Sequence, residues 1–156
     1  VDRLVREDGV LVPSNTTALR EFDFGSGPAA SFPLTLPDLI TIWRETQIPN
    51  IETFVHVIGN AFPGGDLSAL PDGPTEAERA ANRYAAVAEV TAVDGAVTRH
   101  RLETVNGYTF TPMAAAEAAR RVLAGETRPG FQTPVGLFGS GFAETIADTS
   151  ITSIPN

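Results

Sequence analysis

The chain has 156 residues, of which 42% are hydrophobic and 19% are charged, and its formal net charge at pH 7 is −8. This acidic balance argues against a nucleic-acid partner, because binding a phosphate backbone requires a basic face. All 11 basic residues are arginine and no cysteine is present. A catalytic lysine, a disulfide, a thiolate metal site and a cysteine nucleophile are therefore excluded from this chain.

The length suits one domain, so residues 1–156 are interpreted as a single domain. No apolar run approaches the roughly 20 residues that span a bilayer, and acidic residues lie where a signal peptide would have a basic end and an apolar core. We therefore expect no membrane-spanning segment and a cytoplasmic location. The chain begins at Val1, without an initiator methionine and within an alternating pattern, which favours a fragment of a longer protein.

The first half predicts strands joined by turns, with one helix. An Asp8-Gly9 pair between Val/Leu-rich runs predicts a hairpin within residues 1–12. Alternation over 17–24 predicts a third strand. A proline and an acid at 37 and 38 open a helix through Arg44, which should pack into the core. The β-branched run 51–58 predicts another strand, and residues 59–74, with three prolines and four glycines, a loop.

The second half begins with a capping box, Thr75 to Glu78, which predicts a short helix. Residues 84–93 and 96–104 flank Asp94-Gly95, the strongest hairpin signal in the chain. A further turn at Asn106-Gly107 is expected to lead into a strand through Tyr108 and Phe110.

Residues 111–134 predict two successive helices. Thr111 is expected to cap a helix over 112–124, with Pro112 in its first turn and Gly125 closing its end in the left-handed conformation. An ordered turn over 128–134 then leads to a second helix that begins at Thr133-Pro134. The total of six or seven strands, mostly hairpin-linked, and about four helices predicts an α+β fold. Its sheet should be mixed and mostly antiparallel, with helices packed on one face.

No residue of the chain is predicted to bind a dinucleotide or a metal. Residues 136–141 read G-x-x-G-x-G, the reverse of the G-x-G-x-x-G fingerprint, and no strand precedes them. The Gly25-Ser26-Gly27-Pro28 turn could place amide groups near an anion, but no helix follows it directly. No potential metal ligands have the close spacing of known sites.

Three residues are candidates for a substrate pocket: Arg44, Thr46 and His56. Arg44 and Thr46 end the predicted helix just before the Ile48-Pro49 turn, and helix ends beside strand ends often border pockets. His56 is one of only two histidines that could transfer protons near neutral pH. Each also has an ordinary interpretation, because Arg44 favours the carbonyl end of its own helix and surface histidines are common. No catalytic residue is identified.

Several segments together resemble a known family. They are Asp23-Phe24-Gly25, the turn 45–50, the helix start 72–79, the segment Thr104 to Tyr108 and residues 125–134. In this order they resemble the C-terminal domain of saccharopine dehydrogenase-like, NAD(P)-dependent oxidoreductases. The match runs through nearly the whole chain. It departs at Gln47, where relatives carry glycine, and at Leu36-Pro37-Asp38, where they carry tryptophan-glycine-aspartate.

The resemblance implies a division of labour within a longer protein. In that family an N-terminal Rossmann domain binds NAD or NADP, and the C-terminal region covers the substrate side and helps to form a dimer. This chain would then be the substrate-side and assembly domain, catalytically incomplete alone, with the Rossmann domain and a second copy as partners. The alternative is a non-catalytic dimerisation module or a small-ligand-binding module.

Overall fold

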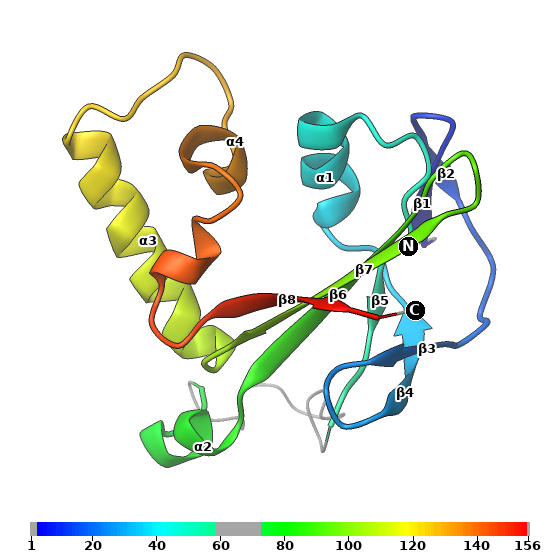
Figure 1. Ribbon diagram of the computed structural model, residues 1–156, viewed down its shortest axis with the longest axis horizontal. Helices are drawn as coiled ribbons and strands as arrows, with labels where there is room; N and C mark the ends of the chain where they lie inside the picture. The colour runs from blue at the N-terminus through cyan, green and yellow to red at the C-terminus, as the bar shows by residue number, and fades with distance from the viewer. Residues whose placement is uncertain (1–2, 59–72, 156) are drawn as a thin grey trace. The chain divides into compact units, whose positions relative to one another are not determined.

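The computed structural model describes residues 3–58 and 73–155, and the fold is α+β. These residues hold eight strands in three small antiparallel sheets, four α-helices and one 3-10 helix (Figure 1). Contacts group the chain into two compact units, residues 1–64 and 65–156. The predicted single domain stays a prediction. The expected loop over 59–74 falls mostly outside the described residues.

The first unit contains two of the sheets and one helix. One sheet pairs β1 (Leu4–Glu7) with β2 (Val10–Pro13), and the other has the order β3-β4-β5. These three strands are Arg20–Asp23, Pro28–Pro33 and Phe54–Val55, and the helix α1 spans Asp38–Thr46.

The hairpin predicted at Asp8-Gly9 is confirmed. Asp8 has φ 46° and Gly9 has φ 80°, which are the positive values that a tight hairpin turn requires at both central positions. The third predicted strand is confirmed as the shorter β3. The segment predicted as a strand over 51–58 forms only the two-residue β5 and an isolated bridge between Ile51 and Arg6.

Helix α1 is confirmed, but only part of its apolar surface is buried. Leu39 is 1% exposed, whereas Ile40 and Ile42 are 48% and 37% exposed. Buried Arg6 fixes the helix to the first hairpin: its Nε donates to the Leu39 carbonyl at 2.8 Å, and its guanidinium carbon lies 4.4 Å from the centre of the Trp43 ring. The core of this unit therefore includes a hydrogen-bonded arginine that stacks on an aromatic ring.

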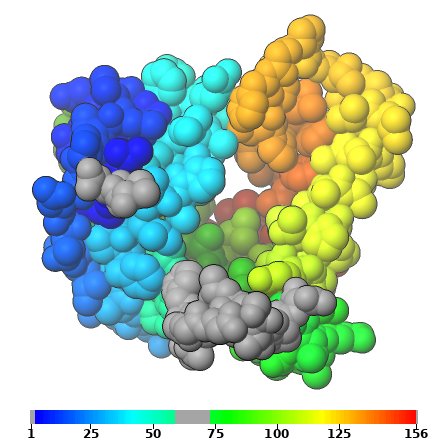
Figure 2. Space-filling model, turned by 180° about the vertical axis from the view of Figure 1, so that it is seen from behind, coloured from blue at the N-terminus to red at the C-terminus, as the bar shows by residue number. Residues whose placement is uncertain are grey.

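The second unit contains the third sheet, with the order β6-β7-β8, and the remaining helices. The strands are Tyr84–Thr91, Val97–Thr104 and Ser150–Ile154. The helices are α2 (Glu76–Ala81), α3 (Gly107–Leu123) and α4 (Pro134–Phe138), followed by the 3-10 helix η2 (Ala143–Thr145). In the space-filling view, α3 and α4 form the yellow and orange surface (Figure 2). No helix in the described ranges is long and apolar enough to cross a membrane.

The capping box and the Asp94-Gly95 hairpin are confirmed. The Thr75 hydroxyl accepts from the Glu78 amide, and the Glu78 carboxylate accepts from the Thr75 amide. Gly95 has φ 84°, and β6 and β7 pair over their full eight residues. The amide hydrogen bond to the Glu78 carboxylate, and next the Thr75 hydroxyl, lower the pKa of Glu78.

The strand predicted through Tyr108 and Phe110 is wrong, because both residues lie in α3. The predicted cap, Thr111, is also wrong, since the helix begins at Gly107. Neither Asn106 (φ −51°) nor Gly107 has the positive φ that a tight hairpin turn needs. The Asn106 side chain instead accepts from the Tyr108 amide at 3.0 Å and caps α3.

The end of α3 and the start of α4 are as predicted. Gly125 has φ 98°, and the amide of Glu126 reaches back to the carbonyl of Arg121, as in a glycine-terminated helix. Thr133 caps α4 at the Gly136 amide, with Pro134 in the first turn. Strands β4 and β8 were not predicted, since neither carries a strong alternating apolar pattern.

Candidate functional site

Arg44 and Thr46 both lie in the last turn of α1, as the sequence indicates. The Thr46 hydroxyl donates to the Ile42 carbonyl at 2.8 Å and accepts from the Ile48 amide at 3.2 Å, so it joins the helix to the turn that follows. Arg44 is exposed at the carbonyl end of the helix, where a positive charge is favourable. The two hydrogen bonds of the Thr46 hydroxyl therefore support a structural role for this residue at the end of α1.

His56 lies just after β5, half-buried against the β3-β4-β5 sheet. Its Nδ1 is 2.9 Å from the Ala30 carbonyl, and its ring stacks on Phe24 with 5.7 Å between the ring centres. Because a carbonyl only accepts, Nδ1 carries the hydrogen, and the neutral ring therefore presents Nε2 as an acceptor. The bonds of His56 and Thr46 go to different segments, so these contacts do not assemble the predicted residues into one catalytic group.

Two amide groups of the 25–28 turn, those of Gly25 and Gly27, already have a partner within the chain. Asp23 Oδ1 accepts from the Gly25 amide at 2.7 Å and from the Gly27 amide at 3.0 Å. A carboxylate of the chain itself therefore satisfies these donors, and the turn is stabilised locally.

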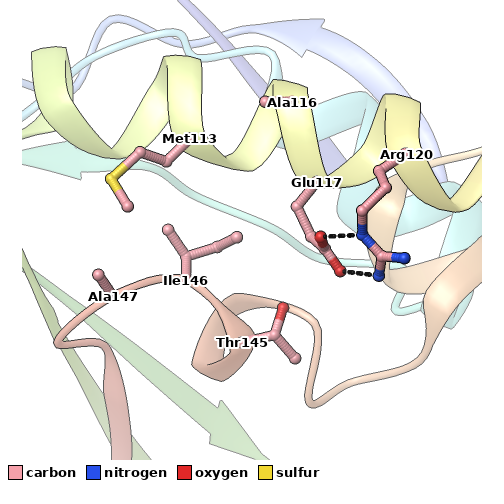
Figure 3. Close-up of a pocket in the computed structure, with 7 residues that line it drawn as sticks. All are labelled: Met113, Ala116, Glu117, Arg120, Thr145, Ile146 and Ala147. Atoms are coloured by element: carbon pink, nitrogen blue, oxygen red, sulfur yellow. Dashed lines mark hydrogen bonds and ion pairs between the residues drawn. The ribbon is translucent and has the colours of Figure 1, made fainter.

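A pocket of about 380 Å³ lies in the second unit, between α3 and the segment that contains η2 (Figure 3). Sequence reasoning did not find it. Its α3 wall consists of residues at helical spacing, and its other wall belongs to a segment about 30 residues later in the chain. The lining residues are Met113, Ala116, Glu117, Arg120, Thr145, Ile146 and Ala147.

At the charged edge of this pocket, the Glu117 carboxylate forms ion pairs with two arginines of α3. Glu117 accepts from Arg120 Nε at 2.7 Å and Nη2 at 2.8 Å, and from Arg121 Nε at 2.8 Å. The hydrogen bonds from Arg120 and then Arg121 lower the pKa of Glu117 to about 2, and the Glu117 carboxylate raises the pKa of Arg120. Both carboxylate oxygens are occupied, so Glu117 is poorly suited to act as a general base.

Arg121 is held from a second direction. Its guanidinium carbon lies 5.4 Å from the centre of the Phe138 ring and 5.3 Å from that of Phe142, and the two rings stack at 5.0 Å. Arg121 therefore links the Glu117 carboxylate, which borders the pocket, to Phe138 of α4 and to the buried Phe142. The pocket is therefore a mostly apolar depression with a rigid charged rim, which is suited to binding rather than to proton transfer.

No cluster of three or more His, Cys, Asp or Glu side chains that could hold a metal occurs in residues 3–58 and 73–155. No family model matches the chain, and no curated protein or solved structure matches it either.

Proposed function

We propose that this chain is the substrate-side and assembly domain of a saccharopine dehydrogenase-like, NAD(P)-dependent oxidoreductase. The proposal rests on the ordered set of motifs described above. The observation that supports it best is the conformation of Gln47. Relatives carry glycine at this position, and here Gln47 has φ 57° at the C-cap of α1. Glycine is the residue that occupies this left-handed conformation without steric cost.

Two other glycines of the resembling segments also stand where glycine is needed. Gly125 has φ 98°, and a Cβ at Gly107 would lie 2.6 Å from the Tyr84 ring. At these positions of the resembling segments, the backbone conformation or the close packing of this fold favours glycine. This agreement supports a shared backbone, from which the substrate-side role is inferred.

In this proposal hydride transfer uses NAD or NADP held by a Rossmann domain outside this chain. Every strand pair in the described parts of the chain is antiparallel, whereas a dinucleotide fold is built from parallel strands joined by helices. The substrate would contact surfaces near the end of α1 and His56, the residues that the sequence proposes.

The first test is the coding sequence upstream of Val1, which should encode a strand followed by G-x-G-x-x-G. The second is a fluorescence titration of NADH and NADPH against the 156-residue chain and against the longer protein. Only the longer protein is expected to bind. A dissociation constant of about 1 μM, or roughly −8 kcal/mol, for the short chain would overturn the division of labour.

The assembly part of the proposal is a cytoplasmic homodimer related by a two-fold axis. Small antiparallel sheets have edges that need a partner, a covering element or protective charge. Sedimentation of the purified chain at micromolar concentration is expected to give the mass of two copies. A monomer under these conditions would contradict this part.

A second candidate function, a small-ligand-binding module, is favoured by the pocket beside α3. Its volume lies within the range of small-molecule sites, and Ile146 in its lining is only 3% exposed. Ala116→Leu would fill the pocket, whereas Ala115→Leu on the same helix lies outside its lining. If an apolar probe such as hexanol binds there, it should change the nuclear magnetic resonance chemical shifts of Ala147 in the wild-type chain. This change should be absent in Ala116→Leu and present in Ala115→Leu.

A further inference from the structure

The pocket beside α3 has an apolar end and a polar end. Its α3 wall is one helical stripe, in which each residue lies three or four positions from a neighbour: Met113, Ala116, Glu117 and Arg120. At the rise of an α-helix this stripe is about 10 Å long. Figure 3 shows Met113 and Ile146 toward one end of the pocket and Glu117 and Arg120 toward the other. A ligand that lies along α3 would therefore contact apolar side chains at one end and charged side chains at the other.

Glu117 orients the guanidinium of Arg120 but uses only one of its edges. Nε and Nη2 of Arg120 donate to the Glu117 carboxylate at 2.7 Å and 2.8 Å. Within the described parts of the chain no hydrogen bond uses Nη1, so the edge formed by Nη1 and Nη2 keeps donors for a further acceptor. The Arg120 side chain is 66% exposed. A guanidinium that is already oriented loses less freedom when it binds a ligand.

The other polar side chains of the pocket restrict the head group of a ligand. The Glu117 carboxylate already accepts three N–H groups, two from Arg120 and one from Arg121. An ammonium group placed there would be repelled by both guanidinium groups. The Thr145 hydroxyl donates its hydrogen to the Phe142 carbonyl at 2.7 Å, so it has none left for a ligand. Among the lining side chains Arg120 is therefore the remaining donor, and a carboxylate matches its planar edge best.

We propose that this pocket binds a small aliphatic carboxylate. Its two oxygens accept from the free edge of Arg120, and its alkyl chain lies along Met113, Ala116 and the buried Ile146. This inference rests on the small-ligand-binding candidate of the proposed function and names the class of ligand. Burial of the alkyl chain supplies attraction without direction, and the charged contact fixes which end of the ligand lies at Arg120.

Three probes with the same alkyl chain test the head group: hexanoate, hexanol and hexylamine. Each is titrated against the 156-residue chain while the nuclear magnetic resonance chemical shifts of Ala147 are followed. We expect hexanoate to bind about fivefold more tightly than hexanol, because the ion pair stays partly exposed to solvent. Hexylamine should bind more weakly than hexanol. The advantage of hexanoate should shrink in about 1 M salt, where charges are screened within roughly 3 Å.

Variants of Arg120 test the contact itself. Arg120→Met keeps a long side chain without donors, so hexanoate should lose its advantage over hexanol. Arg120→Lys keeps the charge but not the planar edge, and it should lose part of the advantage. Arg79→Met is the matched control, since it removes one positive charge from α2, outside the pocket lining, and should preserve the advantage. Glu126→Gln removes a negative charge that acts on Arg120 and should tighten the binding of hexanoate alone.

The outcomes separate this inference from the function on which it rests. If none of the three probes changes the chemical shifts of Ala147, the small-ligand-binding candidate and the carboxylate fail together. If hexanol or hexylamine binds as tightly as hexanoate, the pocket is a ligand site and the carboxylate is wrong. A hexanoate advantage that persists in a folded Arg120→Met variant would also overturn the assignment. Circular dichroism checks the fold of each variant, and Arg120→Lys decides the question if Arg120→Met does not fold.

Discussion

The ring of Tyr84 in β6 lies directly over the backbone of Gly107, the first residue of α3. A Cβ at Gly107 would be 2.6 Å from Cε2 and 2.9 Å from Cδ2 of that ring. Glycine is needed here for space rather than for a positive φ. This contact sets how closely the start of α3 approaches the sheet.

Gly107→Ala should therefore destabilise the chain by about 1 kcal/mol, because the overpacking cost of roughly 1–3 kcal/mol exceeds the gain in helix propensity of up to about 1 kcal/mol. Urea denaturation measures the change. In a Tyr84→Ala background the same substitution should be neutral or stabilising. An equal cost in both backgrounds would show that the ring contact is not the cause.

Gln47→Gly should stabilise the chain by up to about 1 kcal/mol. A non-glycine residue pays roughly 1–2 kcal/mol for the left-handed conformation, and glycine loses about 0.5–1 kcal/mol through the greater freedom of the unfolded chain. The substitution also removes the exposed hydrogen bond from Gln47 Nε2 to the Trp43 carbonyl at 2.8 Å. Gln47→Ala is the control, since it loses this bond and keeps the strain. It should be less stable than wild type in thermal unfolding.

Asn106→Ala should cost about 2 kcal/mol. Asn106 is 5% exposed, and its side chain both accepts from the Tyr108 amide and donates to the Asn82 carbonyl at 2.9 Å. Loss of the cap costs about 1 kcal/mol, and loss of the hydrogen bond to the Asn82 carbonyl costs about 1 kcal/mol more. Asn106→Asp keeps the cap but sets a carboxylate oxygen against that carbonyl. Chemical denaturation should find both variants destabilised, and a wild-type value for either would contradict the dual role.

Glu117→Gln should make stability less dependent on acid pH. The pKa of Glu117 falls from its ordinary 4.5 to about 2 in the folded chain, so its contribution is fully present above pH 4.5. It is lost as the pH falls toward 2, because the carboxylate must then be protonated. The stability difference between wild type and variant should shrink across this window. Glu126→Gln, which removes a nearby charge without these hydrogen bonds, is the control and should show a smaller change.

Local chemistry was enough to predict the elements whose signals lie within a few residues. The Asp8-Gly9 and Asp94-Gly95 pairs form hairpins because Asp8, Gly9 and Gly95 take the positive φ values that suit tight turns. Thr75 and Gly125 mark helix ends through hydrogen bonds to the backbone made within about one turn. The α+β class follows from the alternation of such segments. These features depend on the sequence alone, since each is satisfied by its neighbours in the chain.

Asn106-Gly107 shows where local chemistry is ambiguous. The same dipeptide suits a hairpin turn or a helix start, and the choice depends on the Asn82 carbonyl and the Tyr84 ring, which lie more than 20 residues earlier. The pocket beside α3 likewise needs Ile146 brought to Met113, and strand β8 exists because β7 offers it an edge. Only the tertiary structure decides these features, because the contacts that stabilise them join residues far apart in the chain.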